Sequence, residues 1–277
     1  MESIPELFNE FSFRPRKSQG QNFLADTKIL DRIEEVVLCP PGDLILEVGG
    51  GYGALTDRLA KKGNALTVVE PDHKLFGMLE RKFKQFPNIT LLKADILGLE
   101  LAPLQPPPPG RLTVVGNIPY YLTTPLIIRL LTRYRPLVRK IYFMVQKEVA
   151  DRMAALPGTK AYGSLTLCAQ YHAKVENLIK VPAGCFKPIP KVDSAFVSLE
   201  LRENPILFPE EEAAFFGLVR AIFQSRRKVL SNSLKLLGKP LAQTQVALGK
   251  ANLDPNIRGE QLDMAKLMEL AKALSTP

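Results

Sequence analysis

The sequence predicts an α/β protein in which a doubly wound, mostly parallel sheet is followed by a small all-α domain. Short apolar runs that end at glycine or polar positions alternate with helix-length segments over roughly the first half of the chain. Such alternation is typical of parallel sheets covered by helices. After residue 209 the apolar positions recur at roughly 3.6-residue spacing, which indicates helices. With 277 residues and 46% hydrophobic content, the chain can bury a full core and carry an appended smaller domain.

Five apolar runs are predicted strands of the parallel sheet: residues 44–48, 65–69, 89–92, 112–116 and 141–145. Helix-length segments, such as 54–62 and 72–85, lie between them. Residues 194–201 alternate between apolar and polar positions, as a half-buried strand does, and we expect them to run antiparallel to a strand near 174–181.

Pro205 and Pro209 mark a linker near residues 203–209, and residues 210–277 have helical periodicity. We therefore expect a domain of residues 1–205 that carries the chemistry and a helical domain of residues 206–277.

The composition excludes several classes of protein. No apolar run approaches the roughly 20 residues that span a bilayer, and no signal-peptide core follows the first residue, so we expect a cytoplasmic protein without a membrane segment. Cys39, Cys168 and Cys185 form no Cys-x-x-Cys pair and indicate reduced thiols. His73 and His172 are the only histidines, which argues against a His-rich metal centre.

The charge distribution indicates a polyanionic partner. The net charge is +9, and two long segments contain basic residues but no acid. One lies between Glu100 and Glu148 and the other between Glu212 and Asp254. Solvated helix faces are the ordinary explanation of such segments, but two of them in one chain favour nucleic acid.

Four glycine or polar residues each follow one predicted strand: Gly49, Glu70, Asp95 and Asn117. Ligands of open α/β sheets bind in the crevice beyond the carboxyl ends of the strands. The sequence therefore predicts one ligand site that contains all four residues.

The glycine-rich turn in residues 49–54 has the Gly-x-Gly-x-x-Ala spacing of dinucleotide sites, with Glu70 about 20 residues downstream. Methyltransferases share this turn with nicotinamide-dinucleotide enzymes, so the motif alone does not distinguish the two classes. In either class, Glu70 would accept hydrogen bonds from a ribose diol. Glu47 before the turn and Asp95 at a third strand end favour S-adenosylmethionine, with Asp95 accepting from the adenine amino group. Asp95 as a helix N-cap is the structural alternative.

The stretch Asn117-Ile118-Pro119-Tyr120 suits a nucleobase. The Asn117 side-chain oxygen and the Ile118 carbonyl would accept from an exocyclic amine, Pro119 would hold the turn, and Tyr120 would stack on the ring. These acceptors would favour a pyramidal nitrogen whose lone pair points at the methyl group, which is electrostatic preorganisation. A strand-end turn with a packed tyrosine is the alternative.

The chain resembles the small-subunit ribosomal RNA adenine dimethyltransferases. The resemblance covers most of the chain and is carried by Asn117–Tyr120 together with five other ordered stretches: residues 17–24 (KSQGQNFL), 146–152 (QKEVADR), 161–165 (AYGSL), 186–195 (FKPIPKVDSA) and 223–228 (FQSRRK) followed by 232–234 (NSL).

This resemblance implies a Rossmann-like class I methyltransferase fold that uses S-adenosylmethionine and no metal. It implies that the cofactor is bound by Asn22, Leu24, Gly49, Gly51, Glu70, Asp95, Ile96 and Asn117. It also implies that Phe186 forms a second aromatic wall of the base pocket, opposite Tyr120. Stacking on an aromatic face stabilises a bound base by about 1–3 kcal/mol, which helps offset its extrusion from the RNA.

The implied activity is the N6,N6-dimethylation of two adjacent adenosines in a hairpin near the 3′ end of small-subunit (16S) ribosomal RNA. The implied partner is an immature small ribosomal subunit, and we expect a monomer. Arg226, Arg227 and Lys228 of the helical domain would hold the RNA backbone. Some positions depart from the usual pattern: Gly50 stands where proline is frequent and suggests a looser turn, and Pro71, Tyr121 and Leu122 are also unusual.

Three alternatives remain. The nearest is a large-subunit adenine methyltransferase of macrolide resistance, which shares the cofactor and base motifs; Asp193 and the Arg226–Lys228 segment favour the small-subunit class. A ribosome-assembly or transcription factor that has lost catalysis is disfavoured by the intact Asn117 and Tyr120. A nicotinamide oxidoreductase is disfavoured because no acid–base residue for hydride transfer is evident.

Overall fold

The computed structural model describes residues 4–16, 20–224, 226 and 228–275. Contacts within the chain divide it into two compact units. The first comprises Met1–Ala150 and Ala173–Leu201, and the second comprises Asp151–His172 and Arg202–Pro277. Each unit has its own core of buried apolar side chains.

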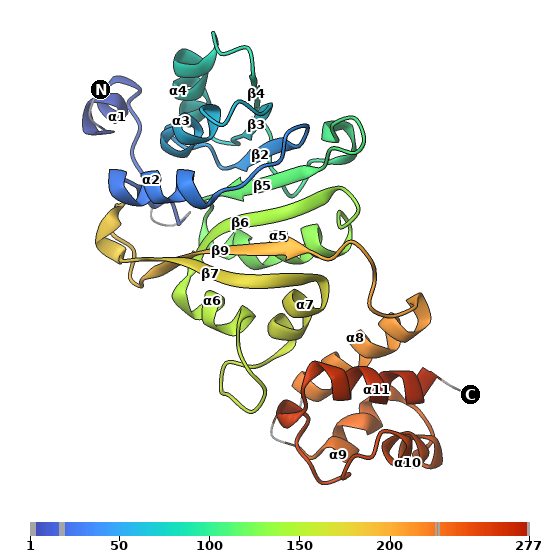
Figure 1. Ribbon diagram of the computed structural model, residues 1–277. Helices are drawn as coiled ribbons and strands as arrows, with labels where there is room; N and C mark the ends of the chain where they lie inside the picture. Colours follow the sequence, from blue (N-terminus) through green and yellow to red (C-terminus); the bar gives the residue numbers. More distant parts are fainter. Residues whose placement is uncertain (1–3, 17–19, 225, 227, 276–277) are drawn as a thin grey trace. The chain divides into compact units, whose positions relative to one another are not determined.

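The first unit is built on a seven-stranded sheet with the strand order β4-β3-β2-β5-β6-β9-β7 (Figure 1). The five strands from β4 to β6 are parallel, and β9 pairs antiparallel with both β6 and β7. Their bounds are β2 (Leu44–Val48), β3 (Leu66–Val69), β4 (Ile89–Leu92), β5 (Leu112–Gly116), β6 (Val138–Gln146), β7 (Ala173–Val181) and β9 (Ser194–Leu201). The central strands β2, β3 and β5 are nearly continuous buried apolar runs, as expected where helices cover both faces of a parallel sheet.

Helices follow the strands of the first unit and cover the sheet, with α2 in front of it and α5 behind it in Figure 1. The helices of this unit are α1 (Ile4–Glu10), α2 (Thr27–Val36), α3 (Ala54–Ala60), α4 (His73–Phe83) and α5 (Tyr120–Thr132), with short 3-10 turns η2 (Ala102–Leu104) and η3 (Ala183–Cys185). Helix α6 (Lys147–Met153) crosses from the first unit into the second. Ile33 of α2, Leu59 of α3 and Leu79 of α4 join one core cluster with Ile45 of β2 and Val115 of β5.

Aspartate side chains fix where two of these helices begin. The Asp26 carboxylate accepts from the Ile29 N–H at the start of α2, and the Asp72 carboxylate accepts from the Lys74 and Leu75 N–H groups at the start of α4. Each bond satisfies a donor that has no partner within the helix, which typically stabilises a protein by about 1 kcal/mol. The cap at Asp72 sets the position of the loop that follows β3.

A second, two-stranded sheet ties distant segments together. Strand β1 (Phe23–Leu24) pairs antiparallel with β8 (Phe186–Lys187), and Leu24 lies opposite Phe186. This pairing attaches the N-terminal segment to the loop that precedes β9.

The second unit is helical. It contains α7 (Ser164–His172), α8 (Pro209–Gln224), α9 (Leu230–Leu234), α10 (Leu241–Lys250) and α11 (Met264–Ser275), with 3-10 turns η4 (Lys235–Leu237) and η5 (Gly259–Gln261). Phe215 and Leu218 of α8 and Leu267 and Leu270 of α11 are fully buried in its core.

The predicted α/β fold class is confirmed, and all seven predicted strands are present. The chain enters the second unit for the last time at Arg202, close to the predicted boundary after residue 205. This unit also takes in residues 151–172, which the sequence analysis placed with the first domain. The assignment of catalysis to one domain and RNA binding to the other stays a prediction. No helix within the described ranges is long and apolar enough to cross a bilayer.

Candidate active site

A cavity of about 800 Å³ opens at the carboxyl ends of the parallel strands of the first unit. Its size is in the range of small-molecule and cofactor sites. All four strand-end residues predicted to share one site line it, namely Gly49, Glu70, Asp95 and Asn117. The parallel arrangement brings them together because each follows the same end of its strand.

The glycine-rich turn forms one side of the cavity. Gly49, Gly51 and Gly53 have φ values of 75°, 55° and 86°, a region that favours glycine. A β-carbon on Gly50 would lie 2.5 Å from the Val68 Cγ1 atom, so the turn packs directly against β3. The turn is therefore tightly packed at Gly50, in contrast to the looser turn expected from the absence of proline.

Glu70 follows β3 and is held by backbone donors. Its Oε2 atom accepts from the Gly51 N–H at 2.9 Å, and its Oε1 atom accepts from the Asp72 N–H at 2.9 Å. Burial raises the pKa of Glu70, while these two N–H groups act to lower it. Each carboxylate oxygen keeps a further lone pair, so the fixed side chain can still accept hydrogen bonds from a diol.

Glu47 is the most unusual polar group of the cavity wall. Its side chain is 0% exposed, and neither carboxyl oxygen has a hydrogen-bond partner within the described part of the chain. Loss of solvation raises the pKa of Glu47 to about 8. The Thr56 hydroxyl lies beside it and lowers this pKa, although the two groups do not meet the geometry of a hydrogen bond. An orphaned buried carboxyl in a cavity wall fits a ligand that brings positive charge, as S-adenosylmethionine does.

Asp95 and Ile96 lie in the loop after β4, and both line the cavity. The Asp95 Oδ1 atom accepts from the Leu97 N–H at 2.9 Å, so the carboxylate closes a local turn rather than capping a helix. Asp95 itself is exposed and Ile96 is buried. A carboxylate and an apolar side chain thus lie next to each other. The carboxylate suits the hydrogen-bonding edge of a purine, and the apolar side chain suits its face.

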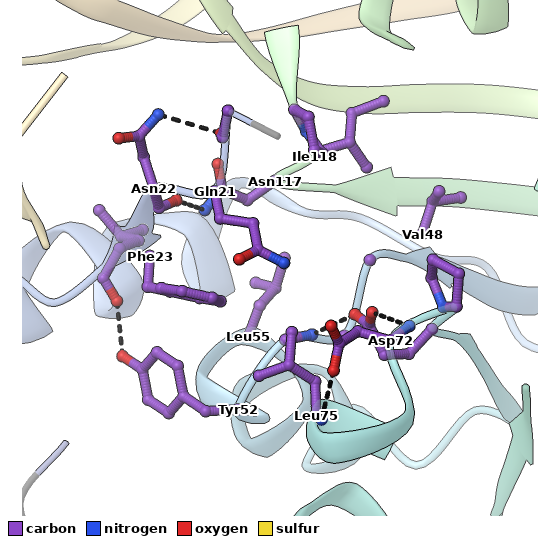
Figure 2. A pocket seen from close by; sticks show the side chains of 18 of the residues that line it. Gln21, Asn22, Phe23, Val48, Tyr52, Leu55, Asp72, Leu75, Asn117 and Ile118 are labelled. Carbon is purple, nitrogen blue, oxygen red and sulfur yellow. Dashed lines mark hydrogen bonds between the residues drawn. The ribbon is translucent and has the colours of Figure 1, made fainter. Parts of the chain in front are cut away.

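The N-terminal segment covers the cavity from another direction. The Asn22 carbonyl accepts from the Asn117 side-chain amide at 3.3 Å, and the Asn22 side chain donates to the Gly20 carbonyl at 3.1 Å (Figure 2). The Tyr52 hydroxyl donates to the Leu24 carbonyl at 2.6 Å. Asn22 and Leu24, both predicted cofactor residues, therefore lie at the cavity and are anchored to two of its other walls.

Residues Asn117–Tyr120 form the turn between β5 and α5, and all four line the same cavity. Because the Asn117 amide nitrogen donates to Asn22, its oxygen is left as an acceptor, with no donor to it among the residues described. Ile118 packs against the turn at Gly49, where an added β-carbon would lie 3.2 Å from its Cγ2 atom. Pro119 is the N-cap of α5, with φ −52° and ψ 136°. The turn therefore presents an amide oxygen and an aromatic ring beside the glycine-rich turn.

Tyr120 is oriented by a residue of β9, a strand that lies two positions from β5 in the sheet. Its hydroxyl and the Ser194 hydroxyl at the start of β9 lie 2.7 Å apart. Burial raises the pKa of Tyr120, so its hydroxyl stays protonated at neutral pH. The ring is thus fixed at one end while its body lines the cavity.

Phe186 occupies a different environment from the other predicted site residues. Its side chain is 1% exposed and belongs to the core cluster of the first unit, opposite Leu24 in the β1–β8 pair. It is not among the residues that line the cavity. A stacking role for Phe186 stays a prediction, and it requires the ring to be uncovered when a base enters.

The three predicted RNA-binding residues differ in their surroundings. Arg226 forms an ion pair with Glu260 and donates to the Lys160 carbonyl at 2.7 Å and the Thr159 carbonyl at 2.9 Å, all within the second unit. Lys228 is exposed. Arg227, like the Lys17-Ser18-Gln19 stretch used in the resemblance, lies outside the described residues.

The model of the family described as "Ribosomal RNA adenine dimethylase" matches residues 12–275 of this sequence. The chain belongs to this family. The resemblance inferred from the motifs is confirmed over nearly the full length, and the enzyme is an S-adenosylmethionine-dependent methyltransferase of this family.

Curated relatives named "Ribosomal RNA small subunit methyltransferase A" support this membership. The chain is 43% identical to the protein of that name from Hahella chejuensis over 92% of this chain and 91% of the relative. It is 39% identical to the one from Alkaliphilus oremlandii over 98% of this chain and 95% of the relative.

Solved structures with the same fold include a "23S rRNA methyltransferase ErmE", with a TM-score of 0.72, 30% identity, and coverage of 91% of this chain and 99% of that one. A "dimethyladenosine transferase from Plasmodium falciparum" has a TM-score of 0.77, 25% identity, and coverage of 90% and 95%. These neighbours confirm the class I methyltransferase fold.

Several residues at the site were not identified from the sequence. Met144 of β6 and Phe196 of β9 line the cavity, and Arg14 and Arg16 stand at its edge. Ser194 holds the Tyr120 hydroxyl. Ser194 lies in a stretch that carried the resemblance, but its partnership with Tyr120 depends on the pairing of β9 with β6. A run of residues does not reveal such pairing.

Proposed function

We propose that this enzyme dimethylates N6 of two adjacent adenosines in a hairpin near the 3′ end of small-subunit (16S) ribosomal RNA, as a step in ribosome biogenesis. The observation that carries this proposal is the shared cavity. The glycine-rich turn with Glu70 and the Asn117–Tyr120 turn, one suited to a cofactor and the other to a base, both line it. Membership of the ribosomal RNA adenine dimethylase family supports the same activity.

Bound S-adenosylmethionine supplies an electrophilic methyl group on a sulfonium leaving group, so the protein needs no covalent nucleophile. Glu70 would bind the ribose hydroxyls, since its carboxylate is fixed by two backbone N–H groups. Asp95 and Ile96 would bind the adenine, and Asn22, Leu24, Gly49 and Gly51 would shape the rest of the cofactor site. The main contribution of these residues is orientation, which can lower a barrier by roughly 7–11 kcal/mol in favourable cases.

Asn117 and Ile118 would activate the base. An exocyclic adenine nitrogen is a poor nucleophile because its lone pair is delocalised into the ring. The Asn117 side-chain oxygen, which has no donor among the described residues, and the Ile118 carbonyl would accept from its two N–H groups. These acceptors would favour the pyramidal form of the nitrogen and stabilise the positive charge that develops on it.

Tyr120 and Phe186 would hold the base. The Tyr120 ring lines the cavity and its hydroxyl is tied to Ser194, which limits its rotation. Phe186 would form the opposite wall of the base pocket. Its ring would first have to become exposed from its buried position beside Leu24 of β1. Two stacking contacts of about 1–3 kcal/mol each would offset the cost of extruding an adenosine from the hairpin.

The helical part of the chain would bind the RNA backbone through Arg226, Arg227 and Lys228. Lys228 is exposed and free to meet a phosphate, whereas Arg226 is engaged with Glu260 and two carbonyls. Arg226 would therefore act by holding the 159–160 loop in place. Such phosphate contacts set affinity and position the substrate without selecting its sequence.

The experiment that tests this proposal is methylation of isolated ribosomal subunits from cells that lack the modification. Each subunit is incubated with the enzyme and isotopically labelled S-adenosylmethionine, and its RNA is digested and analysed by mass spectrometry. Two adjacent N6,N6-dimethyladenosines in small-subunit RNA are expected, with an Asn117→Ala variant as the control of strongly reduced activity.

Label in large-subunit RNA instead would favour the second candidate, a large-subunit adenine methyltransferase. The 30% identity to a 23S rRNA methyltransferase is the observation that supports that candidate, but the small-subunit relatives are more similar, at 39–43%. Cofactor binding without transfer to either subunit would favour an assembly factor that has lost catalysis.

We further infer that the enzyme acts as a monomer in the cytoplasm on an immature small subunit, and membership of the ribosomal RNA adenine dimethylase family supports the choice of a ribosomal partner. Light scattering during size-exclusion chromatography tests the monomer, with a mass near 30.8 kDa as the expected result. Fluorescence microscopy of a tagged chain tests the compartment.

A further inference from the structure

Glu47 is an ionisable group that the methyl-transfer mechanism does not use. It lies on β2 at the centre of the parallel sheet, between Val68 of β3 and Val115 of β5 in register. Glu47 is among the residues that line the cavity, but its side chain is completely buried, and both carboxyl oxygens lack hydrogen-bond partners among the residues the structure describes. Burial of an ionised carboxylate without partners is costly, so the neutral acid is the stable form in this environment.

The charged groups around Glu47 give it no positive partner. Besides the Thr56 hydroxyl, the groups that affect it are Glu70 after β3, Asp57 on α3 and Lys82 on α4. Glu70 and Asp57 favour the neutral acid, and only Lys82 favours the carboxylate. Lys82 is itself paired with Asp57. The described residues therefore leave Glu47 in the cavity wall without a paired counter-ion, so a positive charge that stabilises its carboxylate has to come from a ligand.

We propose that Glu47 is protonated in the empty site and ionises when the positively charged amino-acid portion of S-adenosylmethionine enters the cavity, so that cofactor binding releases one proton to solvent. The O–H bond of the carboxyl group breaks, the proton passes to water or buffer through the open cavity, and the carboxylate remains as counter-ion. This inference rests on the proposed use of S-adenosylmethionine and assigns Glu47 as a positioning residue for it.

The proposal has a consequence for affinity. Since the cofactor binds the ionised form, its apparent dissociation constant falls as pH rises toward the value at which the empty site ionises. Below that value the affinity increases about tenfold for each pH unit, by proton linkage. Burial places the pKa of Glu47 at about 8, so the effect falls in the physiological range.

Isothermal titration calorimetry counts the released protons. Titrations with S-adenosylmethionine at pH 7 in buffers of low and high ionisation enthalpy give the number of protons from the dependence of the observed heat on the buffer. We expect the wild-type enzyme to release most of one proton, because pH 7 lies below the pKa of its buried Glu47. We expect almost no release by Glu47→Gln, whose amide resembles the neutral acid in shape. Glu34→Gln, the same change on the surface helix α2, should match the wild type.

A ligand comparison on the wild-type enzyme tests the proposal without any variant. 5′-Methylthioadenosine carries the nucleoside but no amino-acid portion, so its binding should release no proton from Glu47. Equal release with both ligands, or equal release by wild type and Glu47→Gln, overturns the inference and leaves the proposed methylation of ribosomal RNA untouched. Failure of the wild-type enzyme to bind S-adenosylmethionine at all would overturn both.

Discussion

Asn117 shows how one side chain in this family member is oriented by a contact that is distant in sequence. Its amide nitrogen donates to the Asn22 carbonyl, which leaves the side-chain oxygen toward the cavity. An amide without this contact could rotate by half a turn and present a donor to a base amine. The hydrogen bond therefore decides which atom meets the substrate.

We expect Asn117→Ala to lower kcat by about 10²–10³-fold, the usual loss when one preorganised polar group of a transition-state site is removed. Single-turnover methylation of small subunits measures it. Asn22→Ala is the matched comparison, because it keeps the backbone carbonyl that orients Asn117 and should weaken cofactor binding more than it lowers kcat. Equal losses of kcat in the two variants would show that Asn117 has no special role in the chemical step.

Glu47 should make the stability of the cofactor-free enzyme depend on pH. Its pKa is raised from 4.5 to about 8 by burial, so the folded protein holds a proton that the unfolded chain loses above pH 4.5. The stabilisation is complete below the unfolded value and is lost as pH rises through the folded value. Between these limits the wild type should lose about 1.4 kcal/mol per pH unit relative to Glu47→Gln.

Urea unfolding at pH 5.5 and 7.5, followed by circular dichroism, measures this difference. The gap between wild type and Glu47→Gln should grow by about 3 kcal/mol over the two pH units. Parallel pH profiles of the two proteins would contradict a buried, neutral Glu47.

At the scale of elements, the turn from β2 to α3 depends on close packing against its neighbours. Gly50 has no space for a side chain because Val68 of β3 and Leu79 of α4 lie directly against it. The tight turn keeps Gly49 and Gly51 at the cavity wall. The packing of three elements thus sets the shape of the predicted cofactor site.

Gly50→Ala should destabilise the protein by about 1–3 kcal/mol, because the added β-carbon would lie 2.5 Å from Val68 Cγ1. It should also weaken cofactor binding. Gly217→Ala on α8 is the control, since its β-carbon would meet nothing within 4 Å and alanine favours a helix. Thermal unfolding and cofactor titration of both variants give the result. Recovery of stability by a second change, Val68→Ala, would confirm the steric cause, and equal behaviour of the two alanine variants would exclude it.

At the scale of the whole molecule, the two units have separate cores, and the chain as a whole is basic. The net charge of +9 and the acid-free segment between Glu212 and Asp254 indicate that association with RNA has a large electrostatic component. Such binding weakens as the salt concentration rises, because the release of counterions from the RNA into the solution becomes less favourable.

The double variant Arg227→Glu and Lys228→Glu should weaken binding of the substrate hairpin and reduce the slope of log K against log salt by about 1–2, since two phosphate contacts are lost. Filter binding at several salt concentrations measures this slope. Lys61→Glu combined with Lys84→Glu, at two exposed residues that follow α3 and α4, is the charge-matched control. Arg226 is left unchanged because its loss would disturb the fold. An unaltered slope would place the RNA elsewhere.

Part of the site was predictable because Glu70, Asp95 and Asn117 each follow a strand. Apolar runs identified the strands, and the parallel arrangement placed Glu70, Asp95 and Asn117 on one edge. The burial of Phe186 beside Leu24 and the bond between Tyr120 and Ser194 were not predictable, since they depend on pairing between segments far apart in the sequence.

The sequence by itself determined the order of strands and helices and the kinds of side chain that line the cavity. Through its motifs it also determined the family. These features follow from local periodicity and from residue identity, which a linear chain displays directly. Only the tertiary structure decided that Glu47 is an orphaned acid, that Asn117 presents its oxygen and that Arg226 is bound to Glu260. Solvation and hydrogen-bond partners are properties of the surroundings, and packing alone creates those surroundings.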